Sequence, residues 1–331
     1  MNKEKLLLLG LLLLALIACE ARGEGTVVPA SEESSPLEIV ATTTIVGDVV
    51  RQVVGDVTSV TVLIPPGADS HGFEPSPQDI AAVADADVLF ISGLGLEGFL
   101  EPMLENVGGE TIVVSLSDEI DPLESEGEHA DEHEGEEDEH DEEGEEHEHE
   151  NIDPHVWLDP NNVILWVREI EETLSDVDPA HAEIYRDNAE SYVTDLQELD
   201  RWIEEQVATV PKENRELVTD HEVFSYFAEA YGFEQVGTVI RGVSTMEEPS
   251  AQELADLQDA IRALDIPAIF VGTTVNPTLA EAIAADTSTE IRRVYIESLS
   301  EADGPASNYL EYMRYNVETI VEALKASDAS S

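Results

Sequence analysis

The sequence predicts an α/β protein in which two parallel-sheet lobes are joined by one long, rigid helix. Short apolar runs alternate with helical patterns from residue 37 to residue 115, and the same alternation restarts after residue 211. An uninterrupted helical pattern at 179–210 separates the two regions. Alternating strands and helices are typical of parallel sheets. Two such lobes leave a cleft between them, and small ligands often bind in clefts of this kind.

In the first lobe, apolar and β-branched residues gather in short runs bounded by polar or glycine-containing segments. We expect strands at 37–41, 60–64, 87–91 and 111–115. We expect helices at 45–54, 79–84 and near 97–106. Each strand is thus followed by a segment with helical spacing, as a parallel sheet requires.

The long helix has recognisable start and stop signals. Asp178 is placed as its N-cap, Pro179 as its first helical residue, and Pro211 ends it. A shorter helix at 161–174 precedes it, and the second lobe repeats the alternation. Its expected strands are 216–219, 235–240, 267–271 and 292–296, and its expected helices are 221–231, 250–264, 277–286 and 306–325. We therefore predict an N-terminal lobe at 37–178, a linking helix at 179–210 and a C-terminal lobe at 211–326.

The charge of the chain limits its partners. Among 331 residues, 74 are acidic and 15 basic, which gives a net charge of −59. Such a surface repels nucleic acid and attracts cations. Because it also repels itself, we hypothesise an adaptation to high salt, where charges are screened. A melting temperature that does not rise with added salt would contradict this. We expect a monomer.

The first residues resemble a bacterial lipoprotein signal peptide, here 1–18. An apolar run at 6–17 follows two lysines and is too short to span a bilayer at full thickness. The segment ends Leu-Ile-Ala-Cys, which matches a lipobox, and Cys19 is the single cysteine of the chain. We predict a lipid on Cys19, a flexible tether at 19–36 rich in Gly, Ser, Glu and Pro, and an extracytoplasmic location on the cell membrane. The alternative is an uncleaved anchor helix with an incidental cysteine.

The segment 124–150 interrupts the first lobe. It holds 17 acidic residues and five histidines, and no apolar residue larger than alanine, so it cannot bury a core and is predicted to be disordered. Its histidines are His129, His133, His140, His147 and His149. Interleaved with carboxylates, they suggest a loop that collects zinc weakly, because ordering a flexible loop costs entropy. A solvated acidic linker is the alternative.

Four histidines lie outside that segment. His71 and His221 follow predicted strands, and His155 lies where ordered chain resumes. Since the carboxyl ends of parallel strands face the binding crevice, these three are expected to converge. His181 lies in the first turn of the long helix and is expected at the surface.

Three converging imidazoles predict a transition-metal site. A lone histidine is more often a hydrogen-bonded structural residue, but three at comparable positions favour zinc. Tetrahedral zinc needs a fourth ligand, either a carboxylate or water, and the spacing does not choose between them. Asp69 and Asp159 lie near the histidines and are candidates to orient them. Since the histidines must be neutral to bind, affinity is expected to fall below about pH 6, with a slope approaching three protons per metal.

Three motifs resemble those of the zinc/manganese solute-binding proteins of ABC importers, the ZnuA-like family. They are HGFEPSP at 71–77, DPHVWLDP at 153–160 and HEVFSYF at 221–227. Further similar segments are TTTIVGD at 42–48, EPSAQ at 248–252 and YLEYMRYN at 309–316. The resemblance extends over roughly residues 37–325.

The resemblance implies two α/β lobes bridged by a long helix, with a metal site in the cleft between them. Its ligand positions fall on His71, His155, His221 and Glu297, where the family usually has Asp at the fourth. Zinc-binding members carry a His-rich acidic loop where 124–150 lies, whereas manganese members tend to lack it and to have Glu at the third position. The resemblance thus implies capture of Zn²⁺, with Mn²⁺ or iron as the alternative, and delivery to an ABC permease and its ATPase.

Two motifs of other protein classes match the sequence less well than the metal-binding motifs do. The run GLGLEG at 93–98 matches a dinucleotide-binding pattern, but it falls in the third strand–helix unit and is read as a structural turn. His221-Glu222 begins like a zinc-peptidase motif, yet Ser225 occupies the second histidine position. We expect no enzyme activity. A zinc hydrolase and a surface adhesin remain alternatives.

Overall fold

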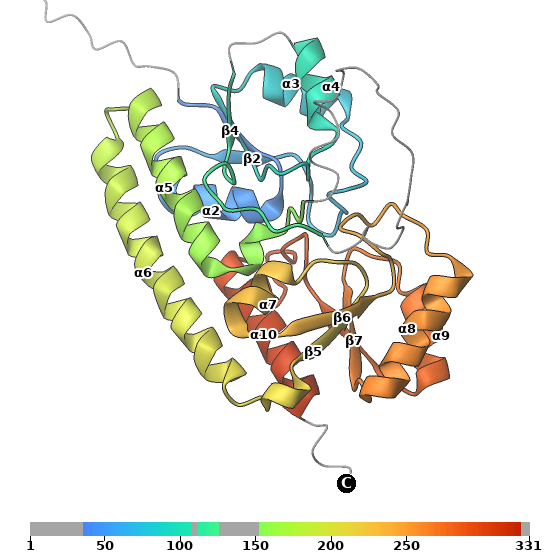
Figure 1. Ribbon diagram of the computed structural model, residues 1–331. Helices are drawn as coiled ribbons and strands as arrows, with labels where there is room; N and C mark the ends of the chain where they lie inside the picture. The colour runs from blue at the N-terminus through green and yellow to red at the C-terminus, as the bar shows by residue number, and fades with distance from the viewer. Residues whose placement is uncertain (1–35, 108–110, 126–151, 326–331) are drawn as a thin grey trace, which may run out of the picture. The chain divides into compact units, whose positions relative to one another are not determined.

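A computed structural model describes residues 36–107, 111–125 and 152–325 (Figure 1). All of its helices and strands belong to one compact unit, Leu37–Ser331. The predicted signal peptide, Cys19 and the five histidines of the acidic segment lie outside the described residues. Within the described ranges, no helix is both long and apolar enough to cross a membrane.

The described chain forms two parallel sheets of four strands each, which confirms the predicted fold class (Figure 1). The first sheet has the order β2-β1-β3-β4, with β1 at Ile39–Ala41, β2 at Val60–Val62, β3 at Val88–Ile91 and β4 at Ile112–Ser115. The second has the order β6-β5-β7-β8, with β5 at Glu216–Thr219, β6 at Glu234–Thr238, β7 at Ala268–Gly272 and β8 at Glu290–Val294.

Both sheets therefore follow the same winding. In each, the chain starts in the middle, adds a strand on one side, and then returns to add two on the other. In such sheets the crevice at the carboxyl ends of the strands, where the direction of winding changes, is the usual binding position. Two sheets of this kind provide two such crevices.

Local signals explain where the helices of the first lobe begin. The hydroxyl of Thr43 accepts a hydrogen bond from the backbone of Val46 and caps α2, Thr44–Val54. Ser76 and Asp79 form a reciprocal capping box at α3, Pro77–Ala84, which therefore starts two residues before the predicted range. The third helix of this lobe, α4, spans Leu100–Val107.

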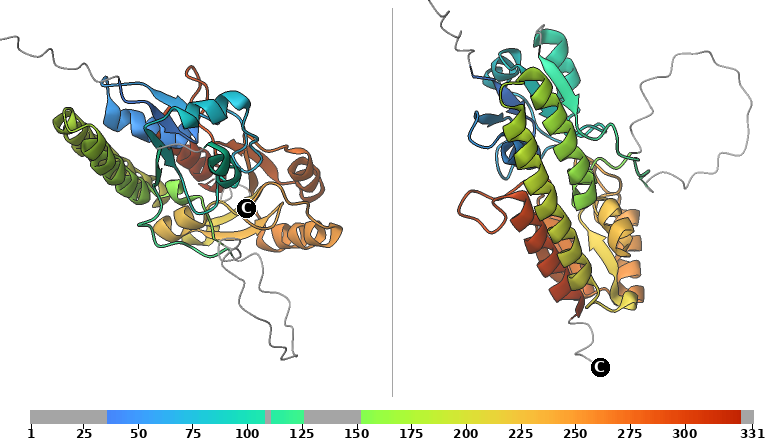
Figure 2. Two further views of the ribbon diagram at one scale, coloured as in Figure 1. Left: turned by 90° about the horizontal axis from the view of Figure 1, so that it is seen from above. Right: turned by 90° about the vertical axis from the view of Figure 1, so that its left-hand side faces the viewer.

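Two helices, α5 at Pro160–Val177 and α6 at Ala182–Val207, lie side by side along the molecule (Figure 2). The predicted start of the long helix was wrong: Asp178 ends α5, and α6 begins three residues after Pro179. The Asp178 carboxylate accepts hydrogen bonds from the His181 ring, at 2.6 Å, and from the Tyr185 hydroxyl, at 2.8 Å. These bonds hold a non-helical turn between the two helices. The ring of His181 is partly exposed, as predicted.

The helix α6 connects the two halves of the fold. It contacts α2 of the first lobe and α10, Tyr309–Lys325, of the second. Its buried side chains recur every three or four residues and form one apolar stripe. They are Tyr185, Ala189, Tyr192, Leu196, Leu199, Ile203 and Val207. The stripe belongs to a single apolar core shared with strands and helices of both lobes.

The remaining helices surround the second sheet: α7 at Ser225–Tyr231, α8 at Ala251–Leu264 and α9 at Thr278–Thr287. The helix predicted from residue 221 starts only at Ser225, because residues 221–224 form a bend that is hydrogen-bonded to the segment after β6. There the backbone N–H of Glu222 donates to the carbonyl of Gly242 at 2.9 Å. The bend leaves His221 at the end of β5 instead of on a helix.

The glycine-rich run after β3 is a structural turn, as predicted. Gly93 and Gly95 adopt φ of 95° and 82°, conformations that favour glycine. The buried carboxylate of Glu97 accepts hydrogen bonds from the backbone N–H groups of Ser92 and Gly93, at 2.7 and 3.1 Å. A side chain of the protein thus uses the amides that a phosphate-binding loop would offer to its ligand.

We predict that Leu196→Ala lowers the free energy of unfolding by about 2–5 kcal/mol, because it opens a cavity in the core along α6. Leu196 is fully buried. Glu198→Ala on the exposed face of the same helix is the control and is expected to change stability by less than about 0.5 kcal/mol. Urea unfolding followed by circular dichroism measures both. Equal effects of the two substitutions would contradict the role assigned to this stripe.

Candidate metal centre

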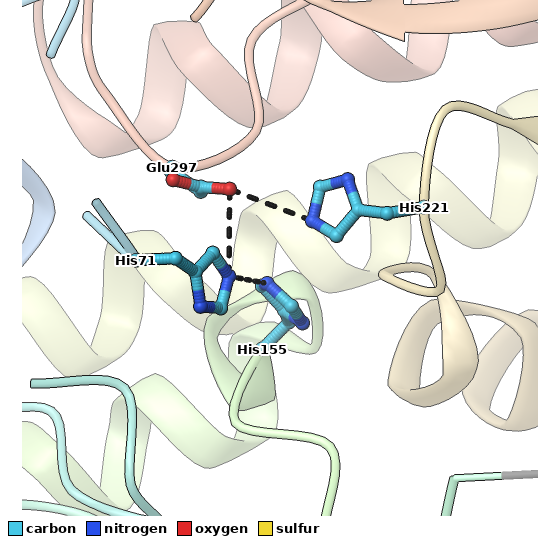
Figure 3. A group of neighbouring side chains, drawn as sticks. All are labelled: His71, His155, His221 and Glu297. Carbon is cyan, nitrogen blue, oxygen red and sulfur yellow. Dashed lines mark hydrogen bonds and ion pairs between the residues drawn. The ribbon is translucent and has the colours of Figure 1, made fainter. Parts of the chain in front are cut away.

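Four side chains that are distant in sequence meet at one point: His71, His155, His221 and Glu297 (Figure 3). One potential ligand atom from each lies within 4.8 Å of the other three. The Nε2 atoms of His71 and His155 are 3.3 Å apart. The Oε1 atom of Glu297 lies 3.5 Å from Nε2 of His71 and 3.4 Å from Nε2 of His221. The structure thus brings together all four predicted ligand positions.

Both lobes contribute to this cluster. His71 lies in the loop after β2 of the first sheet, and His221 comes two residues after β5 of the second. Glu297 comes three residues after β8, and His155 precedes the short 3₁₀ helix at Val156–Leu158 that leads into α5. The carboxyl ends of parallel strands therefore place three of the four side chains.

Carboxylates orient two of the three imidazole rings. Asp153 accepts from the ring Nδ1 of His155 at 2.7 Å, and Asp220 does the same for His221 at 2.9 Å. In each case the same carboxylate oxygen also accepts from the backbone N–H of the histidine, at 2.9 Å. A neutral ring that donates from Nδ1 keeps its Nε2 lone pair free for a metal ion, so in the neutral form these bonds select the tautomer that can bind.

The orienting carboxylate of Asp220 is itself fixed. Its second oxygen accepts from the backbone N–H of Gly272 at 2.6 Å. A β-carbon at position 272 would come within 3.0 Å of that oxygen and 3.2 Å of Ile296. Glycine therefore permits the close approach of β7 to Asp220. Because Asp220 holds the ring of His221, the sheet determines the position of that ring.

The predicted orienting residues behave differently. Asp69 accepts from the backbone N–H of His71 at 2.9 Å and from the hydroxyl of Thr245 at 2.7 Å, so it fixes the loop and not the ring. The prediction for Asp159 was wrong, because this residue caps α5 by accepting from the backbone of Asn161. Asp153 and Asp220 were missed, although each lies within two residues of a candidate histidine.

Glu297 has two unequal oxygens. Its Oε2 accepts from the backbone N–H of Ser70 at 2.9 Å and from the Ser70 hydroxyl at 2.8 Å. Its Oε1, which faces the histidines, has no hydrogen-bond partner, and neither does Nε2 of His221. Buried polar atoms without partners are costly unless a ligand satisfies them. This donor set, three imidazole nitrogens and one carboxylate oxygen, fits a divalent transition metal.

Burial and mutual repulsion keep two of the histidines neutral. Burial, together with repulsion from His155 and His221, lowers the pKa of His71 to about 2. Burial also lowers the pKa of His155, although Asp153 opposes this. Both rings are therefore in the form that binds metal at neutral pH.

The other two groups hold protons more tightly. Burial alone would lower the pKa of His221, but Asp220, Glu297 and Asp153 outweigh it and raise this pKa to about 9. Burial raises the pKa of Glu297 to about 7, although His221 and the hydrogen bonds from Ser70 oppose the shift. Protons therefore compete with a metal ion mainly at His221 and Glu297.

Comparison with known proteins identifies the family. A sequence model described as zinc-uptake complex component A, periplasmic (ZnuA), matches residues 39–323. The chain belongs to the ZnuA family. Both predicted features of that family, the paired α/β lobes and the meeting of the four positions, are present in the fold described above.

Relatives in this family carry names that refer to different metals. The chain is 38% identical to the manganese-binding lipoprotein MntA of Halalkalibacterium halodurans, over 95% of this chain and 96% of the relative. It is 29% identical to the iron-binding protein YfeA of Yersinia pestis, over 88% of each. Among solved structures, the periplasmic zinc-binding protein TroA of Treponema pallidum has a TM-score of 0.75 at 26% identity, over 87% of this chain and 99% of TroA.

We predict that Asp220→Asn weakens metal binding by about 10- to 100-fold, because the amide no longer fixes the ring of His221 as a carboxylate does. Asp159→Asn removes a carboxylate of the same size that caps a helix and is expected to leave affinity unchanged. Titration calorimetry measures both. Equal losses in the two variants would show that Asp220 has no specific part in the site.

We predict that metal binding releases about one proton near pH 8 and about two near pH 6, and not three. With pKa values of about 9 and 7, His221 and Glu297 hold these protons, whereas His71 and His155 are already neutral. Affinity therefore falls as pH falls, and more steeply below pH 7. Calorimetry in buffers of different ionisation enthalpy counts the protons. Release of three protons near pH 6 would contradict this account.

Proposed function

We propose that this protein captures a single divalent transition metal, preferentially zinc, outside the cytoplasm and delivers it to the permease of an ABC importer. The observation that carries the proposal is the cluster of three imidazole rings, two of them fully buried, and one buried carboxylate, drawn from both lobes. Membership of the ZnuA family and the names of its relatives support the transport role.

The preference for zinc rests on the ligand atoms. Imidazole nitrogen suits zinc, whereas manganese favours carboxylate, carbonyl and water oxygens, and the general affinity order of divalent metals also places manganese below zinc. Three nitrogens and one available oxygen match a tetrahedral zinc site. Relatives named for manganese and iron make these metals the alternative cargo in the same role.

A zinc hydrolase is the second candidate from another class. Catalytic zinc keeps an open position for water, with three protein ligands. Here the fourth position is faced by Glu297, which is 2% exposed, and two of the histidines are fully buried. These features favour binding over catalysis.

The proposal includes an anchor and an accessory loop. We expect a lipid on Cys19 that holds the protein at the outer face of the membrane, and weak zinc collection by the histidines of 124–150. Cys19→Ser is expected to release the protein from the membrane fraction or to leave it unprocessed. Processed Cys19→Ser protein that still sediments with membranes would contradict the lipid anchor.

We predict that zinc binds with a stoichiometry of one at the tight site and at least tenfold more tightly than manganese. His155→Ala is expected to weaken zinc binding by several kcal/mol, because the remaining ligands form an incomplete set. His181→Ala removes a histidine in the turn before α6 that is not part of the cluster and is the matched control. Competition titrations with a chelator of known affinity measure each protein.

Two results would overturn the proposed function. Tight zinc binding that survives in His155→Ala would place the site elsewhere. Hydrolysis of esters or hydration of carbon dioxide by the zinc-loaded protein, abolished by His155→Ala, would favour the enzyme.

A further inference from the structure

The carboxylate of Glu297 is held by a residue from the opposite lobe. Ser70 lies in the loop after β2 of the first sheet, whereas Glu297 follows β8 of the second. Ser70 donates twice to Oε2 of Glu297, from its backbone N–H at 2.9 Å and from its hydroxyl at 2.8 Å. Both residues are almost fully buried, at 1% and 2% exposure. Solvent therefore does not compete effectively for these hydrogen bonds.

These two bonds use the capacity of one oxygen. A carboxylate oxygen has about two lone-pair positions, and both of those on Oε2 accept from Ser70. The other oxygen, Oε1, lacks a hydrogen-bond partner and lies within 3.5 Å of two histidine Nε2 atoms. The structure therefore offers one oxygen of Glu297 to a metal ion and withholds the other.

The position of Ser70 does not depend on Glu297 alone. The same loop is attached to the second lobe through the backbone N–H of Gly67, which donates to the hydroxyl of Ser298 at 2.8 Å. Asp69 adds a third attachment by accepting from Thr245. Since the loop is attached to the second lobe at two positions shortly before Ser70, the serine is well placed to hold Oε2 in one orientation.

We propose that Ser70 determines metal specificity by keeping Glu297 a one-oxygen ligand, so that the site offers four ligand atoms and selects zinc over manganese. This inference rests on the proposed function, in which the four clustered side chains bind a divalent metal. If the Oε2 atom were released, Glu297 would become able to bind through both oxygens and give five ligand atoms. Such a site suits manganese better, because manganese prefers more oxygen ligands than zinc does.

A purely structural role for Ser70 makes a different prediction. In that case the serine would only fasten the loop to the second lobe, as Ser298 does through Gly67. Ser298 is also buried, at 2% exposure, and its hydroxyl bonds lie beside Glu297 without reaching its carboxylate. Ser298→Ala is therefore a matched control that removes an attachment of the same loop without removing either hydrogen bond to Glu297.

The test compares the full-length wild-type protein, Ser70→Ala and Ser298→Ala. Each receives half an equivalent of Co²⁺, whose visible absorption is intense in tetrahedral sites and weak in five- or six-coordinate sites. Zinc and manganese affinities are then measured by competition with a chelator. Any weak binding by the acidic segment is common to the three proteins and cancels in the comparison.

We expect intense Co²⁺ bands in the wild type and in Ser298→Ala, and weaker bands in Ser70→Ala. The ratio of zinc affinity to manganese affinity should fall about tenfold in Ser70→Ala, as the loss of one hydrogen bond to a charged group implies. It should remain unchanged in Ser298→Ala.

Three outcomes would overturn the inference. The first is an unchanged Co²⁺ spectrum and an unchanged affinity ratio in Ser70→Ala. The second is an equal change in both variants, which would indicate a general loosening of the loop. The third is weak Co²⁺ bands in the wild-type protein, a measurement that does not depend on whether a variant folds. In all three cases the proposed function stands if the wild type binds zinc tightly, whereas failure of the wild type to bind any divalent metal removes the function itself.

Discussion

The carboxylate of Glu297 contacts histidines through one oxygen and Ser70 through the other, and the arrangement of the site depends on this carboxylate. One oxygen faces the Nε2 atoms of His71 and His221, and the other accepts two hydrogen bonds from Ser70. These contacts join the loop after β2 to the segment after β8, so the two lobes meet at the carboxylate. A buried acceptor without a partner costs about 1–3 kcal/mol, and a charged one costs more. Oε1 of Glu297, which has no hydrogen-bond partner, therefore makes the site unfavourable for the protein alone and favourable for a cation.

The surrounding structure fixes these groups in place. Asp153 and Asp220 hold two rings with Nε2 turned inward, and β7 holds Asp220 through the backbone of Gly272. The stripe of α6 belongs to the core shared by both lobes, and α6 contacts helices of each. A preformed site of this kind binds more tightly than a flexible one, because less conformational entropy is lost on binding.

The sequence was a good guide to the features that depend on local patterns. Strands with apolar runs such as 87–91, and the convergence of His71 and His221 from strand ends, were predicted from periodicity and from the geometry of parallel sheets. Glu297 was different: nothing in the residues around it distinguishes it from other glutamates, and only the resemblance to the ZnuA-like family identified its position.

Other features depended on three-dimensional contacts. Pro179 and Asp178 have the residue types of a helix start, but the bonds of Asp178 to His181 and Tyr185 produce a turn instead. The bend at 221–224 follows from a backbone bond to Gly242, which is distant from it in sequence. The link between Ser70 and Glu297 joins residues 227 positions apart, and neither residue alone suggests it.

The central claim is that both lobes supply the ligands of one zinc ion. X-ray absorption spectroscopy of the full chain with one equivalent of zinc tests it most directly. We expect four light scatterers at about 2.0–2.1 Å, with the outer-shell signals of three imidazole rings. A spectrum with one imidazole or none would contradict it, because the cluster of His71, His155 and His221 would then not be the site that zinc occupies.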